Sequence, residues 1–296
     1  MICMDISYRE NVDIGAISSM KTGGKAKKAV FPSSEQELKD AVRELYRRGE
    51  KYYVLGNMSN VLIPEGELDF VPVVTTGVKG FSAEKGEDGR VHVYAGCGAS
   101  LTKLAYEMCK KGYAGMQFAY GIPGSIGGAV YMNAGAYGSE ISSVLEYADF
   151  YDAESDKVER LTNAQCDFGY RTSVFQSRNG VILGASFVLE EGDVELLMNE
   201  AKQTMQKRID KQPLEYPSCG SAFKRPEGYF AGALIEECGL KGKNVGGAYV
   251  SEKHAGFIVN KGGATTDDVL GLISFVQKTV LEEKGVALEP EIRIIE

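Results

Sequence analysis

The segment most informative about the fold is Tyr120-Gly-Ile-Pro-Gly-Ser-Ile-Gly-Gly-Ala-Val-Tyr-Met-Asn-Ala-Gly-Ala-Tyr-Gly138. Six glycines and one proline stand there among small and apolar residues. Glycine lets main-chain NH groups approach a ligand closely, and successive NH groups in such turns form an anion-binding nest. Glycine also adds entropy to the unfolded chain, so a purely structural loop would not need six of them. The segment therefore predicts a loop that contacts a ligand, with an incidental turn as the alternative interpretation.

A second loop, Leu55-Gly-Asn-Met-Ser-Asn-Val-Leu62, directly follows a strand predicted at 52–55. Its Asn57, Ser59 and Asn60 add short polar side chains to the backbone donors, which suits a pyrophosphate. An Asx-type turn is the alternative interpretation. Because both loops leave strand ends, they could converge on one extended dinucleotide. The sequence has no P-loop, no G-x-G-x-x-G after its first strand and no G-x-S-x-G elbow, so the common nucleotide-binding and hydrolase motifs are absent.

The composition is that of a globular protein that acts on small molecules. Its 296 residues, 44% of them hydrophobic, are enough for two packed domains. A net charge of -8 without a long block of like charge argues against a nucleic-acid partner. The chain opens without a basic region followed by an apolar core, and no apolar run reaches membrane-spanning length. We therefore expect a cytoplasmic protein with no membrane partner.

The cysteines and histidines argue against a metal site. The two histidines, His92 and His254, have no obvious second ligand beside them, so we expect neither a zinc site nor a Cys-His catalytic pair. The cysteines are scattered, form no C-x-x-C pair and are expected to be reduced structural thiols. They are Cys3, Cys97, Cys109, Cys166, Cys219 and Cys238.

Helix and strand patterns alternate along the chain, and most helices begin at a recognisable capping residue. The first helix is expected to begin at the Ser34 cap, with Glu37 completing a capping box, and to end at Gly49. Two prolines interrupt the helical pattern at 212–217, which we interpret as the hinge into a second domain. The other expected helices span 100–112, 194–209, 231–238 and 266–284, and the expected strands span 52–55, 91–95, 144–151, 157–161, 181–189, 247–250, 256–259 and 292–295.

A third segment, Tyr216-Pro-Ser-Cys-Gly-Ser-Ala-Phe-Lys-Arg-Pro226, places a serine and two cations in a turn-rich stretch. With five other motifs in the same order, it resembles the UDP-N-acetylenolpyruvoylglucosamine reductase family over nearly the whole chain, from Met20-Lys-Thr-Gly-Gly24 onward. No insertion follows Arg171 before the strand at 181–189, so the chain resembles the shorter, type II members. The six motifs are Leu55-Gly-Asn-Met-Ser-Asn-Val-Leu62, Gly121-Ile-Pro-Gly-Ser-Ile-Gly-Gly128, Asn133-Ala-Gly-Ala-Tyr-Gly138, Phe168-Gly-Tyr-Arg-Thr-Ser173, Gly220-Ser-Ala-Phe-Lys224 and Leu288-Glu-Pro-Glu-Ile-Arg293.

The resemblance implies an α+β fold. It implies an FAD-binding domain of the vanillyl-alcohol-oxidase (PCMH) type at about 22–188, with lobes at 1–75 and 76–208, and a smaller α+β substrate domain at 209–296. FAD would be bound non-covalently. The residues that match the family's FAD contacts are Gly56, Asn57, Ser59, Asn60 and Val61 in the first loop, and Gly121, Ile122, Gly124, Ser125, Gly127, Gly128, Asn133 and Gly135 in and after the second.

The resemblance also implies a reaction. NADPH would reduce FAD, and the enolpyruvyl ether of a UDP-sugar would then be reduced to UDP-N-acetylmuramate for peptidoglycan. Ser221 matches the family's proton donor, Arg171 its catalytic arginine and Glu291 its catalytic carboxylate. A serine proton donor needs a nearby cation, and a guanidinium can hold a carboxylate in a bidentate fork. By residue type alone, Ser221 is a turn residue, Arg171 a partner in a surface salt bridge, and Glu291 a charge entering an edge strand.

The expected substrate contacts are cations. Lys211 and Lys224 can supply positive charge to the diphosphate of a UDP-sugar, although bare lysines are more often solvated. Arg225 stands where the family often has asparagine, so its contact to the uridine or phosphate would be made differently. We expect a monomer whose partners are the UDP-sugar and NADPH. The alternatives are another FAD oxidoreductase of the same fold, and a non-catalytic regulator that binds a UDP-sugar or flavin.

Overall fold

The computed structural model describes residues 6–296, which form two compact units. Unit 1 contains the N-terminal stretch up to Glu10, Lys28–Asn57 and Asp69–Gln206. Unit 2 contains Asn11–Lys27, Met58–Leu68 and Lys207–Glu296. The second unit therefore includes two N-terminal segments in addition to the C-terminal residues from Lys207 onward. Cys3 lies outside the described residues.

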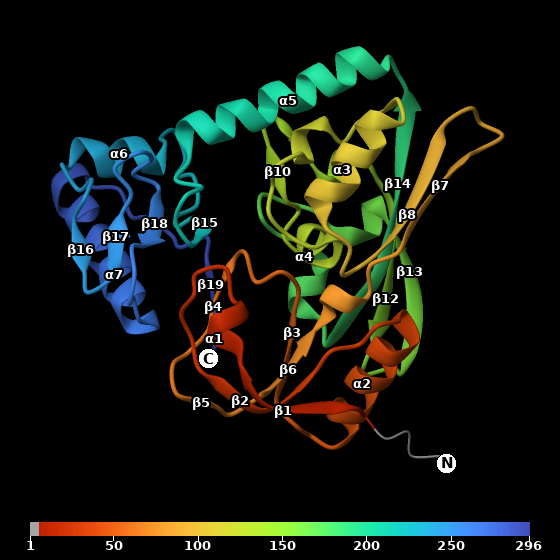
Figure 1. Cartoon of the computed structure of the whole chain (residues 1–296), viewed down its shortest axis with the longest axis horizontal. Helices are drawn as coiled ribbons and strands as arrows, with labels where there is room; N and C mark the ends of the chain where they lie inside the picture. The colour runs from red at the N-terminus through yellow and green to blue at the C-terminus, as the bar shows by residue number, and fades with distance from the viewer. Residues whose placement is uncertain (1–5) are drawn as a thin grey trace. The chain divides into compact units, whose positions relative to one another are not determined.

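Unit 1 is built on an antiparallel sheet in the order β13-β12-β14-β8-β7, in which β14 (Gly180–Glu191) is the longest strand. Its central register places Ala148 of β12 opposite Ala185 of β14, and Ala185 opposite Ala95 of β8, all three fully buried. Helices α3 (Leu101–Lys110) and α4 (Ile126–Tyr131) belong to the same unit, and α4 packs against β14 and β8 (Figure 1). The other strands are β7 (Phe81–Lys85), β8 (Val91–Gly96), β9 (Tyr113–Ala114), β12 (Leu145–Asp152) and β13 (Lys157–Thr162).

A smaller sheet has the order β1-β2-β6-β3, and β3 (Tyr52–Leu55) runs parallel to β6 (Val71–Val74). Helix α2 (Glu35–Arg47) precedes β3 and buries Leu38, Val42 and Leu45 in the core of unit 1. Its cap differs from the predicted capping box. Ser34 Oγ accepts the NH of Glu37, but the Glu37 carboxylate accepts the NH of Ser33 instead of that of Ser34. The remaining strands here are β1 (Tyr8–Asp13), β2 (Lys25–Val30) and β5 (Glu67–Leu68).

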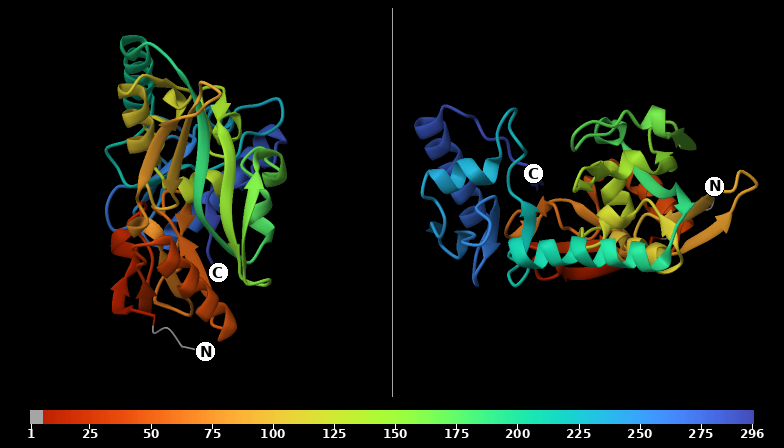
Figure 2. Two further views of the ribbon diagram at one scale, coloured as in Figure 1. Left: turned by 90° about the vertical axis from the view of Figure 1, so that its right-hand side faces the viewer. Right: turned by 90° about the horizontal axis from the view of Figure 1, so that it is seen from above.

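Unit 2 has a four-stranded sheet in the order β15-β18-β17-β16, with α6 (Ala231–Glu237) and α7 (Thr266–Lys284) in the same unit (Figure 2). α7 packs against β16, β17 and α6. Its Thr265 cap forms a complete capping box with Asp268. The strands that lie wholly in this unit are β5, β4 (Val61–Leu62), β15 (Ser218–Ser221), β16 (Asn244–Val245), β17 (Ala248–Val250), β18 (Phe257–Asn260) and β19 (Arg293–Ile294).

Short segments complete the fold. α5 (Val194–Lys211) leads from unit 1 into unit 2. Within residues 6–296, no helix combines the length and the apolar character needed to cross a bilayer. The remaining elements are α1 (Ile14–Ile17), β10 (Gly135–Ala136), β11 (Ser139–Glu140) and the 3₁₀ turns η1 (Thr75–Gly77), η2 (Gln117–Ala119), η3 (Ile141–Ser143), η4 (Asn163–Cys166) and η5 (Val174–Ser177).

The predicted α+β class is confirmed, and the predicted strand at 52–55 and helix at 266–284 have the predicted bounds. The glycine-rich segment was predicted as a loop throughout, but it contains α4 (Ile126–Tyr131). The terminal strand is shorter than predicted and covers only Arg293–Ile294. Residues 6–296 also contain eleven strands that the sequence patterns did not indicate: β1, β2, β4, β5, β6, β7, β9, β10, β11, β15 and β16.

Candidate functional site

The two glycine-rich loops meet in unit 1. Gly56 follows the end of β3, and a Cβ atom placed on it would lie 2.1 Å from Ser125 Oγ. Only a residue without a side chain can approach Ser125 this closely. The structure therefore brings together the first part of the loop at 55–62 and the segment at 120–138.

Backbone hydrogen bonds hold the second loop against the start of α3. Leu101 NH donates to Gly124 O at 3.0 Å, and Ile126 NH donates to Ala99 O at 2.9 Å. Thr102 Oγ1 donates to Ile122 O at 2.7 Å. These contacts hold Ile122 and Gly124 against the first turn of α3.

Glycine is needed in this loop for two reasons. Gly121 and Gly124 have φ angles of 93° and 159°, which other residues rarely adopt. Gly127 donates its NH to Cys97 O at 2.7 Å, and a Cβ on Gly127 would lie 3.0 Å from that of Cys97. Ser125 caps α4 by accepting the NH of Gly128 at 3.3 Å.

Where the loops meet, they line a cavity of about 320 Å³. Asn57, Gly124 and Ser125 line it, as the sequence predicts for a ligand-binding site. Lys79, Ser100 and Lys103 also line it, although the sequence analysis did not assign them to a site. Two ammonium groups, two hydroxyls and an amide suit an anionic ligand such as a phosphate. Lys79 and Lys103 stand in no recognisable motif, and Ser100 was identified only as a helix cap.

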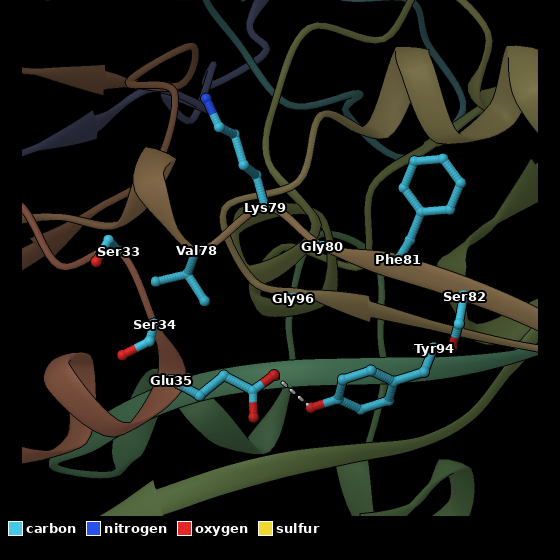
Figure 3. A pocket seen from close by; sticks show the side chains of 10 residues that line it. All are labelled: Ser33, Ser34, Glu35, Val78, Lys79, Gly80, Phe81, Ser82, Tyr94 and Gly96. Carbon is cyan, nitrogen blue, oxygen red and sulfur yellow. Dashed lines mark hydrogen bonds between the residues drawn. The ribbon is translucent and has the colours of Figure 1, made fainter.

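A second cavity of about 340 Å³ shares Lys79 and Phe81 with the first. Figure 3 shows the Glu35 carboxylate pointing toward the Tyr94 hydroxyl, which donates to it at 2.9 Å, whereas Lys79 points away from both. Burial and this hydrogen bond raise the pKa of Tyr94 well above its usual range. None of the predicted site residues lines this cavity.

The remaining half of the first loop belongs to unit 2. Met58 adopts a positive φ of 51°, after which Ser59 and Asn60 lead into β4 with Val61. Asn60 Nδ2 donates to Glu291 O at 3.1 Å, and Asn60 O accepts the NH of Arg293 at 3.0 Å. The structure thus places Asn60, predicted as a cofactor contact, beside Glu291, predicted as catalytic.

Asn133, Gly135 and Arg171 lie close together in unit 1. The fully buried Asn133 donates to Gly169 O at 3.1 Å and accepts the NH of Ser142 at 3.0 Å. Arg171 donates to Gly135 O at 3.2 Å, and its guanidinium lies 4.8 Å from the centre of the Tyr170 ring. Its φ of 59° is a left-handed conformation that costs a non-glycine residue about 1–2 kcal/mol.

Ser221 and Glu291 lie in unit 2, close to one another along a short ladder. Ser221 ends β15, and Ala222 O accepts the NH of Glu291 at 2.9 Å. Lys224 NH donates to Glu289 O at 2.8 Å, and the Lys224 ammonium is paired with the Glu289 carboxylate.

The other two predicted substrate contacts are also exposed cations. Lys211 is the last residue of α5. Arg225 donates to Tyr229 O at 3.3 Å and stacks 4.1 Å from the centre of the Phe230 ring.

Comparison with known proteins identifies the family. Residues 26–161 match the FAD binding domain, and residues 212–295 match the C-terminal domain of UDP-N-acetylenolpyruvoylglucosamine reductase. The reductase of Clostridium botulinum (strain Okra / Type B1) is 44% identical over 94% of this chain and 89% of its own. That of Lactobacillus delbrueckii subsp. bulgaricus is 41% identical over 98% of this chain and 96% of its own.

A solved structure agrees with these sequence relatives. The crystal structure of UDP-N-acetylenolpyruvylglucosamine reductase from Thermus caldophilus has a TM-score of 0.82 and 32% identity, and covers 98% of this chain and 100% of its own. The resemblance drawn from the six motifs is therefore confirmed. The chain belongs to the UDP-N-acetylenolpyruvoylglucosamine reductase family.

Proposed function

We propose that this protein uses NADPH and non-covalently bound FAD to reduce UDP-N-acetyl-3-O-(1-carboxyvinyl)-glucosamine to UDP-N-acetylmuramate, in the cytoplasm, for peptidoglycan synthesis. Family membership supports the reaction. The observation in the chain itself that best supports it is the ladder in unit 2 in which Ala222, the residue after Ser221, accepts the NH of Glu291. Reduction of an enolpyruvyl group needs a positioned proton donor, and this ladder holds the proposed donor Ser221 and the proposed catalytic carboxylate Glu291 in one unit.

The FAD-binding region would be of the PCMH type at about 22–188, with lobes at 1–75 and 76–208, and the substrate domain would span 209–296. The cavity at the meeting point of the two loops suits the pyrophosphate of a dinucleotide, because Lys79 and Lys103 line it and supply positive charge. Asn57, Gly124 and Ser125 would contact the pyrophosphate. FAD would supply the hydride chemistry between NADPH and the sugar nucleotide.

The residues of the chain would manage the proton and the developing charge. Reduction of the enolpyruvyl double bond adds a hydride to one carbon and a proton to the carbon that carries the carboxylate. Ser221 would donate that proton from its hydroxyl. Arg171 would hold the substrate carboxylate as it gains enolate character, and Glu291 would orient the intermediate or assist its protonation.

The substrate's diphosphate would be bound by cations of unit 2. Lys224 follows Ser221 by three positions, and Lys211 precedes the segment that leads to it. Arg225, held by the Tyr229 carbonyl and stacked on Phe230, would contact the uridine or a phosphate. An arginine at this position can make such a contact in a fork geometry that the asparagine of other family members cannot.

The proposal is tested by separating the two half-reactions under anaerobic conditions. Ser221→Ala should leave bleaching of the flavin bands by NADPH nearly unchanged, and should slow their return with the enolpyruvyl sugar nucleotide by about 10²- to 10⁴-fold. Ser218→Ala, in the same strand, is the matched control and should slow neither step. Equal losses in both half-reactions of Ser221→Ala would contradict its role as proton donor. Absence of flavin binding, even after reconstitution, would contradict the proposed function as a whole.

A further inference from the structure

An ion pair next to Ser221 is not explained by the proposed mechanism. The Lys224 ammonium is hydrogen-bonded to the Glu289 carboxylate, and the two residues are also joined through their backbones, with Lys224 NH donating to Glu289 O at 2.8 Å. Lys224 is a proposed contact of the substrate's diphosphate. Its ammonium is therefore already paired with an anion before any substrate is bound.

The ladder places this pair on the same face as Glu291. Phe223 and Pro290 form an antiparallel bridge, and Phe223 is buried in the core of unit 2. Because successive side chains of a strand point to opposite faces, Lys224, Glu289 and Glu291 lie on the face opposite to Phe223. Two carboxylates thus share one face with a single ammonium in this ladder.

The pair contributes little to the stability of the fold. The Lys224 side chain is 28% exposed and that of Glu289 is 69% exposed. Ion pairs this open to water add little, because water screens the attraction and two long side chains lose conformational freedom. Glu289 should affect the binding of an anionic ligand more than it affects the stability of the fold. Its carboxylate is in direct contact with the ammonium group that such a ligand needs.

We propose that Glu289 competes with the diphosphate of the substrate for Lys224 and so weakens the binding of the sugar nucleotide. This inference rests on the proposed function. When the diphosphate binds, the Lys224 ammonium leaves the Glu289 carboxylate and pairs with the diphosphate. Lys224 is thus paired with an anion both with and without substrate. If the ammonium instead keeps both partners through its three donors, the Glu289 charge still repels the diphosphate, and the effect has the same sign.

The test is the affinity for UDP, measured by calorimetry on the FAD-loaded protein. Glu289→Gln removes the charge and keeps the shape, and should tighten UDP binding about two- to fivefold, the range that the coupling of an exposed ion pair allows. The same substitution in a Lys224→Met background should change the affinity by less than about 1.5-fold, since the cation for which Glu289 competes is gone.

A matched control is available in the same unit. Lys284 and Glu237 form a pair at 2.9 Å with side-chain exposures of 29% and 59%. Glu237→Gln should leave UDP binding unchanged, which separates a local effect from a general loss of negative charge. The affinity gain of Glu289→Gln should also shrink as salt is raised, because the competition is electrostatic.

Three results would overturn the inference. Weaker UDP binding in Glu289→Gln would mean that Glu289 positions Lys224 for the ligand. Unchanged binding would mean that the pair has no part in it, and a gain that persists in the Lys224→Met background would place the effect elsewhere. If the wild-type protein turns over the sugar nucleotide while Glu289→Gln shows no gain, only this inference fails. If the wild-type protein does not bind UDP at all, the proposed function fails with it.

Discussion

Substituting Gly56 by alanine tests directly whether the two glycine-rich loops meet as the structure indicates. The new Cβ would lie 2.1 Å from Ser125 Oγ and 3.2 Å from Ser125 Cβ. Gly56 is outside the left-handed region, so the obstacle is space and not backbone conformation. To relieve the overlap, Ser125 must rotate its hydroxyl away, which breaks the hydrogen bond from Gly128 NH that caps α4.

The cost can be worked out from these contacts. An N-cap hydroxyl contributes about 1 kcal/mol, and overpacking of a well-packed site costs about 1–3 kcal/mol. Gly56→Ala should therefore lower the free energy of unfolding by about 2–4 kcal/mol. Ser125→Ala alone should lower it by about 1 kcal/mol, because it loses only the cap. In the double variant the hydroxyl is gone and the nearest atom of residue 125 is its Cβ, at 3.2 Å. Its cost should therefore fall below the sum of the single costs by about 1–2 kcal/mol.

Urea unfolding of the apo-proteins measures the free energy of unfolding of the wild type, the two single variants and the double variant. Titration of flavin fluorescence measures their affinity for FAD. Gly56→Ala should weaken FAD binding, because the added methyl group displaces Ser125, which lines the cavity. Gly128→Ala is the control for stability, since its Cβ would stand at an ordinary 3.4 Å from the same Ser125 oxygen. Strict additivity of Gly56→Ala and Ser125→Ala, with FAD affinity unchanged, would refute the reasoning.

Four further outcomes can be measured on the same protein. A hydrogen bond to Glu146 raises the pKa of His92, so the stability this residue contributes is full below about pH 6.5 and is lost as the pH rises through the raised pKa. His92→Asn should then lower the melting temperature more at about pH 5.5 than at about pH 8.5, and equal shifts at both would contradict the pairing. Burial lowers the pKa of His254, which makes it cost stability as the pH falls below about 6.5. His254→Asn should accordingly lose less stability than the wild type on acidification, and a larger loss would mean that the ring is charged in the fold. Burial raises the pKa of the Cys97 thiol to about 12, so it should not react with DTNB in the native protein at mildly alkaline pH, and native-state labelling at Cys97 would disprove its burial. Lys79→Gln should weaken FAD binding to the apo-protein and lessen its dependence on salt, and an unchanged titration would remove Lys79 from the site.

Local signals were enough to predict much of the fold. Thr265 begins α7 with a capping box and Gly285 ends it in a left-handed conformation, so the predicted bounds 266–284 are those of the structure. Ser100 likewise caps α3 by accepting the NH of Lys103. These features depend on residues within a few positions of one another, and the sequence displays them directly.

Helix α4 shows where local reasoning fails. Glycine has a low helix propensity, and the pattern at 121–138 was accordingly interpreted as loop throughout. The helix at Ile126–Tyr131 follows backbone hydrogen bonds that Ile126 and Gly127 make with Ala99 and Cys97. Those partners lie on another segment, so tertiary contacts overrode the propensity of the residues themselves.

The make-up of unit 2 has a similar cause. Residues 11–27 and 58–68 join the C-terminal part of the chain through contacts far apart in sequence. Thr266 Oγ1 donates to Ile63 O at 2.6 Å, and Arg293 of β19 pairs with Val61 of β4. A two-residue strand has too little pattern to be recognised, so no reading of periodicity could have assigned these segments.

At the site, motifs identified residues but could not assign their contacts. Asn60 and Asn133 were both selected as cofactor contacts, yet the structure shows the Asn60 amide donating to Glu291 O and the Asn133 amide linking Gly169 to Ser142. Their side chains therefore hold other segments of the predicted site in place. If replacing either asparagine changes the affinity for FAD or the rate of turnover, we expect the change to act through the backbone that the amide holds. The ladder in which Ala222 accepts the NH of Glu291 also pairs Lys224 with Glu289, a residue of the motif at 288–293 to which the sequence assigned no role. Residue type alone identifies groups able to perform the chemistry. Only the folded chain shows which other charged side chains those groups contact, as Lys224 contacts Glu289.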